Sequence, residues 1–185
     1  MNRMHGVALA LGSALLGGMA LLPVTAAGQA AGGAPTDPQI AAIVVAANQA
    51  DIDAAKAVKS RTKTKDVRDF ADTMIRDHEA ANKEAKALVK KLHVKPEPNP
   101  TSKSLQDGAK KNIAALKKLK GAKLDRAYID HEVAYHEQVL DAIKATLTPN
   151  AQNPELKALL EKDTPAFQAH LDLAKELQGK LGAAK

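Results

Sequence analysis

The stretch FADTMIRDHE, residues 70–79, returns in altered form 58 residues later as YIDHEVAYHE, residues 128–137. The matched pairs are Phe70 with Tyr128, Asp72 with Asp130, His78 with His136, and Glu79 with Glu137. Between the two copies lies HVKPEPNPTS, residues 93–102, whose prolines exclude a continuous helix. The repeat therefore supports two related helical hairpins joined by a proline-punctuated crossover.

Apolar residues at helical spacing surround both copies. Ile40, Val44 and Ala47, for example, recur at steps of four and three, which places them on one helix face. The same spacing predicts helices over residues 38–59, 65–92, 104–119, 123–147 and 154–181. The chain is rich in Ala, Leu and Lys and has no Trp, which favours helices over sheets. We therefore expect an all-α protein, an up-down four-helix bundle with an additional Lys-rich helix in the crossover.

The N-terminal residues have a different composition. Arg3 and His5 precede the apolar run GVALALGSALLGGMALLPV, residues 6–24, and small residues follow. This pattern predicts a signal peptide over residues 1–26, a flexible linker over 27–37 and the bundle domain over 38–185. The run is also about long enough to span a bilayer as a retained anchor, but its glycines and Pro23 favour cleavage. We expect an exported protein of the periplasm or cell envelope, which has no cysteine for a disulfide.

The formal net charge is +6, and lysines concentrate in residues 102–123. A nucleic-acid partner is disfavoured, because the chain is expected to be exported and has few aromatic residues on which bases could stack. The simpler interpretation of this segment is a solvated helix face. Weak contact with an anionic envelope surface is the functional alternative.

The segment IDHEVAYHE, residues 129–137, resembles the zinc-protease signature H-E-x-x-H at first sight. That signature places its two histidines four residues apart, on one helix face. His131 and His136 are five apart, so their side chains diverge by about 140°. One helix cannot direct both at one ion, whereas Glu132 and His136, four apart, share a face.

Each of the four long predicted helices carries a metal-competent residue within its apolar stripe. These residues are Asp51, His78, His136 and His170, with Glu132 as a reserve ligand. Burying such groups unpaired is costly, and three imidazoles with a carboxylate suit a transition metal ion such as Zn, Cu or Fe. The alternatives are ordinary core histidines that hydrogen-bond each other or hold water, or two separate pairs. Two pairs are plausible because the predicted heights of Asp51 and His78 differ by about 7 Å.

Three stretches, two of which include the repeated segments, carry a family resemblance: FADTMIRDHEAAN, LDRAYIDHEVAYHEQV and TPAFQAHLDLAKEL. In these stretches the chain resembles the exported bacterial domain-of-unknown-function family 4142. The matching positions are Phe70, Met74, Ile75, Asp77, His78, Asn82, Asp125, Tyr128, His136, His170, Leu171 and Ala174. The resemblance implies a ferritin-like helical bundle, without an established activity.

Two departures from known patterns bear on function. Tyr135 precedes His136 where the family pattern has an aspartate, and the chain contains no Glu-x-x-His motif of the kind that diiron bundles use. Ferroxidase chemistry is therefore not supported. Three hypotheses remain: a non-catalytic exported bundle tied to metal handling or envelope stress, a metal-dependent oxidoreductase using the buried His/Asp cluster, and an interaction protein using the basic segment. The sequence does not decide whether the protein is an enzyme.

Overall fold

The computed structural model describes residues 33–183, which lie within one compact unit. The helices are α1 (Asp37–Lys59), α2 (Lys65–Lys91), α3 (Pro100–Lys117), α4 (Ala122–Ala142), the π-helical turn η1 (Ile143–Leu147), the short α5 (Thr148–Asn150) and α6 (Pro154–Ala183). There is no strand in this range, and the prediction of an all-α bundle is confirmed. The predicted signal peptide and most of the predicted linker fall outside the described residues.

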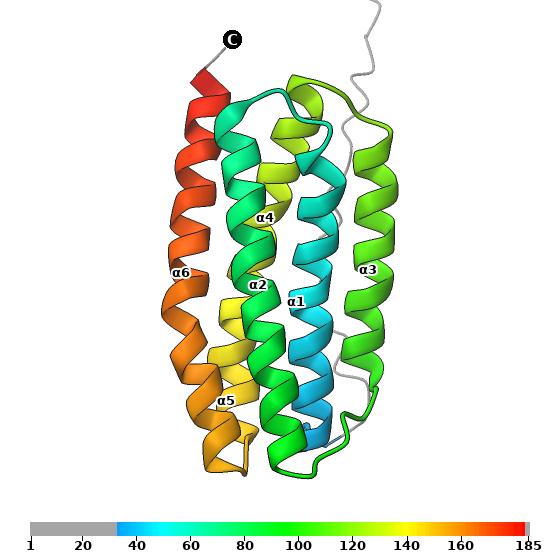
Figure 1. The fold of residues 1–185 in the computed structure, drawn as a ribbon, viewed down its shortest axis with the longest axis vertical. Coiled ribbons are helices and arrows are strands. Elements are labelled where there is room, and N and C mark those ends of the chain that lie inside the picture. Colours follow the sequence, from blue (N-terminus) through cyan, green and yellow to red (C-terminus); the bar gives the residue numbers. More distant parts are fainter. Residues whose placement is uncertain (1–32, 184–185) are drawn as a thin grey trace, which may run out of the picture. The chain divides into compact units, whose positions relative to one another are not determined.

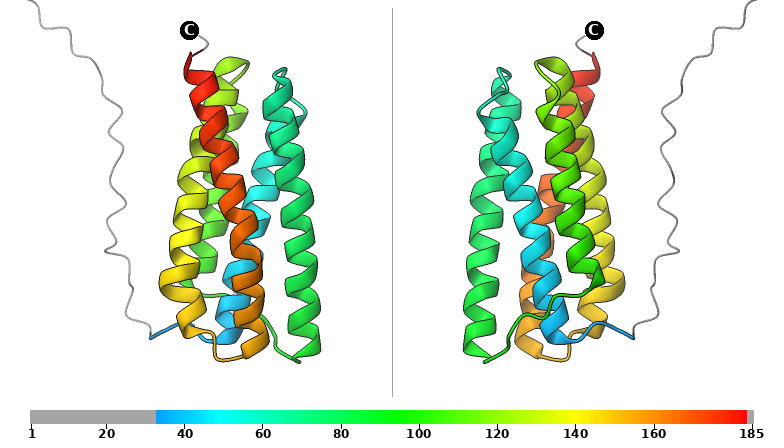
Figure 2. Two further views of the ribbon diagram at one scale, coloured as in Figure 1. Left: turned by 90° about the vertical axis from the view of Figure 1, so that its left-hand side faces the viewer. Right: turned by 90° about the vertical axis from the view of Figure 1, so that its right-hand side faces the viewer.

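The five long helices alternate in direction along the chain (Figure 1). Helices α1, α2, α4 and α6 form the bundle, and α3 lies against the outer side of α1, opposite α6 (Figures 1 and 2). Because α3 carries the chain back along the length of the bundle, α2 and α4 run in the same direction. The two helical hairpins of the bundle are thus joined by one long crossover that contains α3.

The core of the bundle has two apolar halves. One half gathers around Phe70 and Tyr128, and the other around Ile40 and Phe167. Along each of the four bundle helices, the residues of one half are separated from those of the other by buried polar residues. The molecule therefore contains a polar layer across its middle, between two hydrophobic clusters.

Several boundaries differ from those that the sequence predicted. Helix α3 begins at Pro100 rather than near 104, because the Asn99 side chain accepts a hydrogen bond from the Ser102 amide at 3.0 Å and caps the helix there. The fourth helix passes into η1 and α5, which shortens the predicted loop over residues 148–154. Helix α6 continues through Pro165 without a break, as the predicted helix over residues 154–181 requires.

Helix α2 ends in a left-handed turn at a non-glycine residue. His93 has φ 53°, its amide bonds to the Lys90 carbonyl at 3.2 Å, and the Val94 amide bonds to the Val89 carbonyl at 2.9 Å. These two bonds define a Schellman motif, in which glycine is the usual residue at this position.

Among the described residues, no helix is both long and apolar enough to cross a membrane.

Candidate metal centre

The polar layer brings together one or two side chains from every bundle helix. Asp51 comes from α1, His78 from α2, Glu132 and His136 from α4, and His170 from α6, and each is at most 4% exposed. The three histidine rings lie at centroid distances of 5.3, 5.5 and 5.7 Å from one another. Nε2 of His78 is 3.5 Å from Oδ2 of Asp51. The five side chains thus form one cluster, which we call the His–carboxylate centre.

Each histidine of the centre is held by one ring nitrogen. Nδ1 of His78 is 2.9 Å from Oδ1 of Asn48, and Nδ1 of His136 is 3.0 Å from the backbone carbonyl of Glu132. Nε2 of His170 is 3.0 Å from Oδ2 of Asp77. Since all three partners are acceptors, each of these nitrogens carries the proton. In the neutral imidazole the second nitrogen then has a free lone pair.

Six further polar atoms of the centre are buried without hydrogen-bond partners. They are Nε2 of His78 and His136, Nδ1 of His170, Oδ1 of Asp51 and both carboxylate oxygens of Glu132. Buried polar atoms in folded proteins almost always have a partner, so six unpartnered atoms within one layer are unusual. One ligand atom from each of His78, His136 and His170 lies within 4.8 Å of the others, and the same holds for Asp51, Glu132 and His136.

Burial sets the protonation of these groups. It lowers the pKa of His78 from 6.5 to about 3, and it also lowers the pKa of His136. Both imidazoles are therefore neutral at pH 7, which is the form that binds metal ions. Burial raises the pKa of Asp51, and burial followed by the nearby Asp51 charge raises that of Glu132 well above its usual value. A bound cation would have the opposite effect, because a nearby positive charge favours the ionised carboxylate.

The supporting residues are placed by helical spacing. Asn48 lies three residues before Asp51 on α1, and Asn82 lies four after His78 on α2, so both pairs share a helix face. The Asn48 Nδ2 group donates to Oδ1 of Asn82 at 3.3 Å, which joins the two helices beside the centre. Asp77 is oriented in turn by the Arg76 guanidinium, whose hydrogen bond is the main reason that the pKa of Asp77 is lowered.

The structure brings together all four residues that the sequence singled out, along with the reserve residue Glu132. The alternative of two separate pairs does not describe the arrangement, because the three histidine rings are mutual neighbours. Their role as metal ligands stays a prediction. His131 lies outside the centre, half-buried and stacked on Tyr135 at 5.5 Å.

Sequence reasoning missed Asn48 and its link to His78. Its signal is the three-residue step to Asp51, which was available in the sequence.

The Lys-rich segment 102–123 includes most of α3, on which only Ser102 and Leu116 are buried. Most of its lysines therefore face solvent, and contact with an anionic envelope surface stays a prediction.

A one-crossover helical bundle with a buried His–carboxylate centre describes the class of protein. The family model of a domain of unknown function, DUF4142, matches residues 22–177, and the chain belongs to this family. No curated protein sequence matches the chain.

Two solved structures of DUF305 proteins are similar in fold. The crystal structure of a DUF305 fragment from Deinococcus radiodurans has a TM-score of 0.66 at 14% identity, covering 80% of this chain and 99% of that one. The crystal structure of the "putative secreted protein DUF305" from Streptomyces coelicolor has a TM-score of 0.67 at 13% identity, covering 78% of this chain and 93% of that one. At these identities the likeness concerns the fold alone.

Proposed function

We propose that the chain is an exported metal-binding protein, whose bundle holds one transition metal ion in the His–carboxylate centre. The observation that carries this proposal is the set of buried, unpartnered donor atoms, which comes from all four bundle helices. Three imidazole nitrogens and one or two carboxylate oxygens form a donor set that suits zinc, copper or iron. His78, His136 and His170 would bind through the nitrogens that face one another, and Asp51 and Glu132 would complete the site.

One donor pair has the spacing that a shared ion requires. Ligand atoms about 2.0–2.1 Å from a tetrahedral zinc ion are separated from each other by roughly 3.4 Å. Nε2 of His78 and Oδ2 of Asp51 are 3.5 Å apart, close to this value. The distance is also long for a hydrogen bond between the two atoms. The pair is therefore better arranged to share a cation than to bond directly.

The outer hydrogen bonds also suit a metal centre. Histidine ligands in proteins usually donate their other ring N–H to a carboxylate, a backbone carbonyl or water, which fixes the ring and its tautomer. His170 has the carboxylate of Asp77, and His136 has the carbonyl of Glu132. His78 has the amide oxygen of Asn48 in the same role. All three rings are thus held with their free nitrogens inside the centre.

Export is supported by the signal-peptide pattern in residues 1–26 and by the description of the Streptomyces coelicolor neighbour as a "putative secreted protein". Export and the proposed metal site together suggest a role in metal handling outside the cytoplasm. Binding alone is proposed here, without a reaction.

The proposal is tested by measuring the metal content of the chain, produced without a polyhistidine tag. The protein is stripped with a chelator and titrated separately with zinc, copper and ferrous iron, with thermal unfolding and elemental analysis as readouts. We expect close to one ion per chain and a rise in the midpoint of unfolding, because an ion that binds only the folded state stabilises it.

The matched variants are His136→Ala and His131→Ala. The two histidines lie on the same helix, five residues apart, but only His136 belongs to the centre. We expect His136→Ala to abolish stoichiometric binding and His131→Ala to retain it. Equal loss in both variants, or a wild-type chain that none of the three ions stabilises, would refute the proposal.

A further inference from the structure

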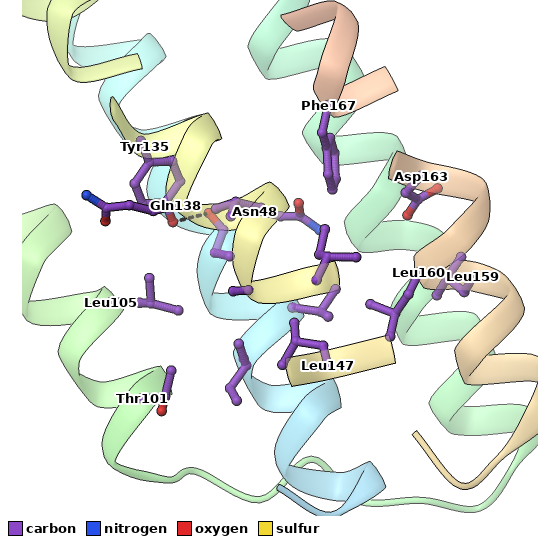
Figure 3. Close-up of a pocket in the computed structure, with 16 residues that line it drawn as sticks. Asn48, Thr101, Leu105, Tyr135, Gln138, Leu147, Leu159, Leu160, Asp163 and Phe167 are labelled. Atoms are coloured by element: carbon purple, nitrogen blue, oxygen red, sulfur yellow. Dashed lines mark hydrogen bonds between the residues drawn. The ribbon is translucent and has the colours of Figure 1, made fainter. Parts of the chain in front are cut away.

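The bundle contains an apolar cavity of about 220 Å³ (Figure 3). Its walls come from α1, α3, α4, η1 and α6 and consist mainly of Ile, Leu, Val, Ala and two aromatic side chains. A cavity of about 150 Å³ lined by similar residues is large enough to hold benzene. This cavity therefore has room for a single aromatic ring with a small substituent, or for two fused rings.

The cavity has an outer and an inner end. Thr101 on α3 and Gln138 on α4 line it and are exposed, so it reaches the surface between these two helices. Asn48 and Phe167 also line it and are buried. In Figure 3, Thr101 and Gln138 lie on the α3 side, and Phe167 lies across the cavity from them.

The inner end is in direct contact with the centre. The Phe167 ring stacks on the His78 ring, with centroids 5.1 Å apart and planes inclined by 16°. Asn48 holds the same histidine through the contact between its Oδ1 and Nδ1 of His78, at 2.9 Å. Two lining residues of the cavity are thus the immediate neighbours of one predicted metal ligand.

We propose that the cavity binds a small, neutral aromatic molecule, with its ring between Tyr135 and Phe167 and its inner edge against the neighbours of His78. This inference rests on the proposed function only for its significance, since it would place an organic ligand next to the metal centre.

The residues that line the cavity indicate which kind of ligand it binds. Two aromatic rings, Tyr135 and Phe167, offer surfaces on which another ring packs favourably. The only charged side chain in the lining is the carboxyl of Asp163, which disfavours an anionic ligand such as a fatty acid. The polar groups of Thr101 and Gln138 lie at the mouth, where a single polar substituent of the ligand would meet them.

The first experiment titrates the metal-free chain with indole. Since the chain has no Trp, the emission of indole is measured with little background. We expect a saturable blue shift as indole enters the apolar cavity. In the Ala142→Phe variant, whose new ring would occupy the cavity, the affinity is expected to fall at least tenfold.

The control is Ala134→Phe, the same substitution at an exposed position of α4 outside the cavity. It is expected to bind indole as the wild type does. If Ala142→Phe does not fold by circular dichroism, competition in the wild type replaces it: toluene is expected to displace indole, and cyclohexane to displace it at least tenfold more weakly. Equal binding in the two Phe variants, or equal displacement by toluene and cyclohexane, would overturn the proposal.

The second experiment locates the ligand by NMR of the histidine rings. Toluene is expected to shift the ring resonances of His78 in the metal-free chain and to leave those of His93, at the end of α2, unchanged. Shifts of similar size at both rings, or none at His78, would show that the ligand is not beside the centre. Neither experiment requires a metal, so a chain that binds toluene and no ion would refute the proposed function and leave this inference standing.

Discussion

Replacing Glu132 with methionine is expected to stabilise the metal-free protein and to weaken its metal binding. Glu132 has no exposed surface, and neither of its carboxylate oxygens meets the geometry of a hydrogen bond, although Asp51 and Tyr128 lie close enough to influence its pKa. Methionine has a similar length, favours helices and brings no polar atom that needs a partner. The hydrogen bond that orients His136 is preserved, because its Nδ1 is held by the backbone carbonyl of residue 132, which the substitution does not remove.

The size of the effect follows from the unpartnered atoms. A buried polar group without a partner costs about 1–3 kcal/mol, so the metal-free variant is expected to gain about that much free energy of unfolding. For a chain of this length, each kcal/mol moves the midpoint of thermal unfolding by about 2–4 °C. The expected increase is therefore about 2–12 °C. Conversely, losing one donor is expected to weaken metal binding at least about tenfold.

The sign of the pH dependence gives a second readout. Burial raises the pKa of Glu132 in the folded protein well above 4.5, so the folded state keeps a proton that the unfolded state loses. The contribution of this carboxyl to the free energy of unfolding is full below about pH 4.5. It is lost as the pH rises toward the pKa of Glu132 in the folded protein. The stability gap between the Glu132→Met variant and the metal-free wild type is therefore expected to widen with rising pH, by up to about 1.4 kcal/mol per unit.

Urea unfolding of the chelator-treated proteins measures the gap, and the same series with added ion measures what the metal contributes. The matched control is Glu137→Met on the same helix, where the side chain is half-exposed and pairs with Lys175 at 2.7 Å. Such exposed pairs contribute little, so a change within about 0.5 kcal/mol is expected there. A metal-free Glu132→Met protein less stable than wild type by more than 1 kcal/mol would refute the view that this carboxyl is an uncompensated buried group.

Three further predictions concern the support of the centre and the fold. Asp77→Ala removes the acceptor that orients His170 and is expected to weaken metal binding about 10–100-fold in a chelator competition, with the helix content unchanged. Phe70→Ala removes a ring that is 1% exposed and is expected to cost about 3–5 kcal/mol in urea unfolding, against less than about 0.5 for the exposed Leu173→Ala. His93→Gly relieves a left-handed conformation and is expected to add about 0.5–1 kcal/mol by the same assay; a loss would contradict the Schellman assignment.

The helices could be predicted from the sequence because a bundle helix buries one continuous face. Their ends were harder to predict, because ends depend on local hydrogen bonds. The Asn99 cap sets the start of α3 four residues earlier than the apolar pattern indicates. Pro165 does not end α6, because its position is exposed and the carbonyl that loses its partner there can face solvent.

The candidate site was predicted in part for a related reason. The apolar stripe along each predicted helix identified Asp51, His78, His136 and His170. Glu132 was named only as a reserve ligand. The buried face of a bundle helix is wider than one line, at least about 100°, so Glu132 and Asn48 are buried as well. The meeting of the three histidines in one layer depended on helix register, which only the fold provides.

The direction of the hydrogen bonds in the centre supports the proposed metal site over a purely structural role. A polar network that served only to align the helices would close its bonds within the layer, because each open bond costs stability. Here Asn48, the Glu132 carbonyl and Asp77 hold the histidines by the nitrogens that face away from the centre. Six nitrogens and oxygens on the inner side of the centre are left without hydrogen-bond partners. A cation bound among these atoms would satisfy several of them at once, which is why we propose a metal ion as the ligand of the centre.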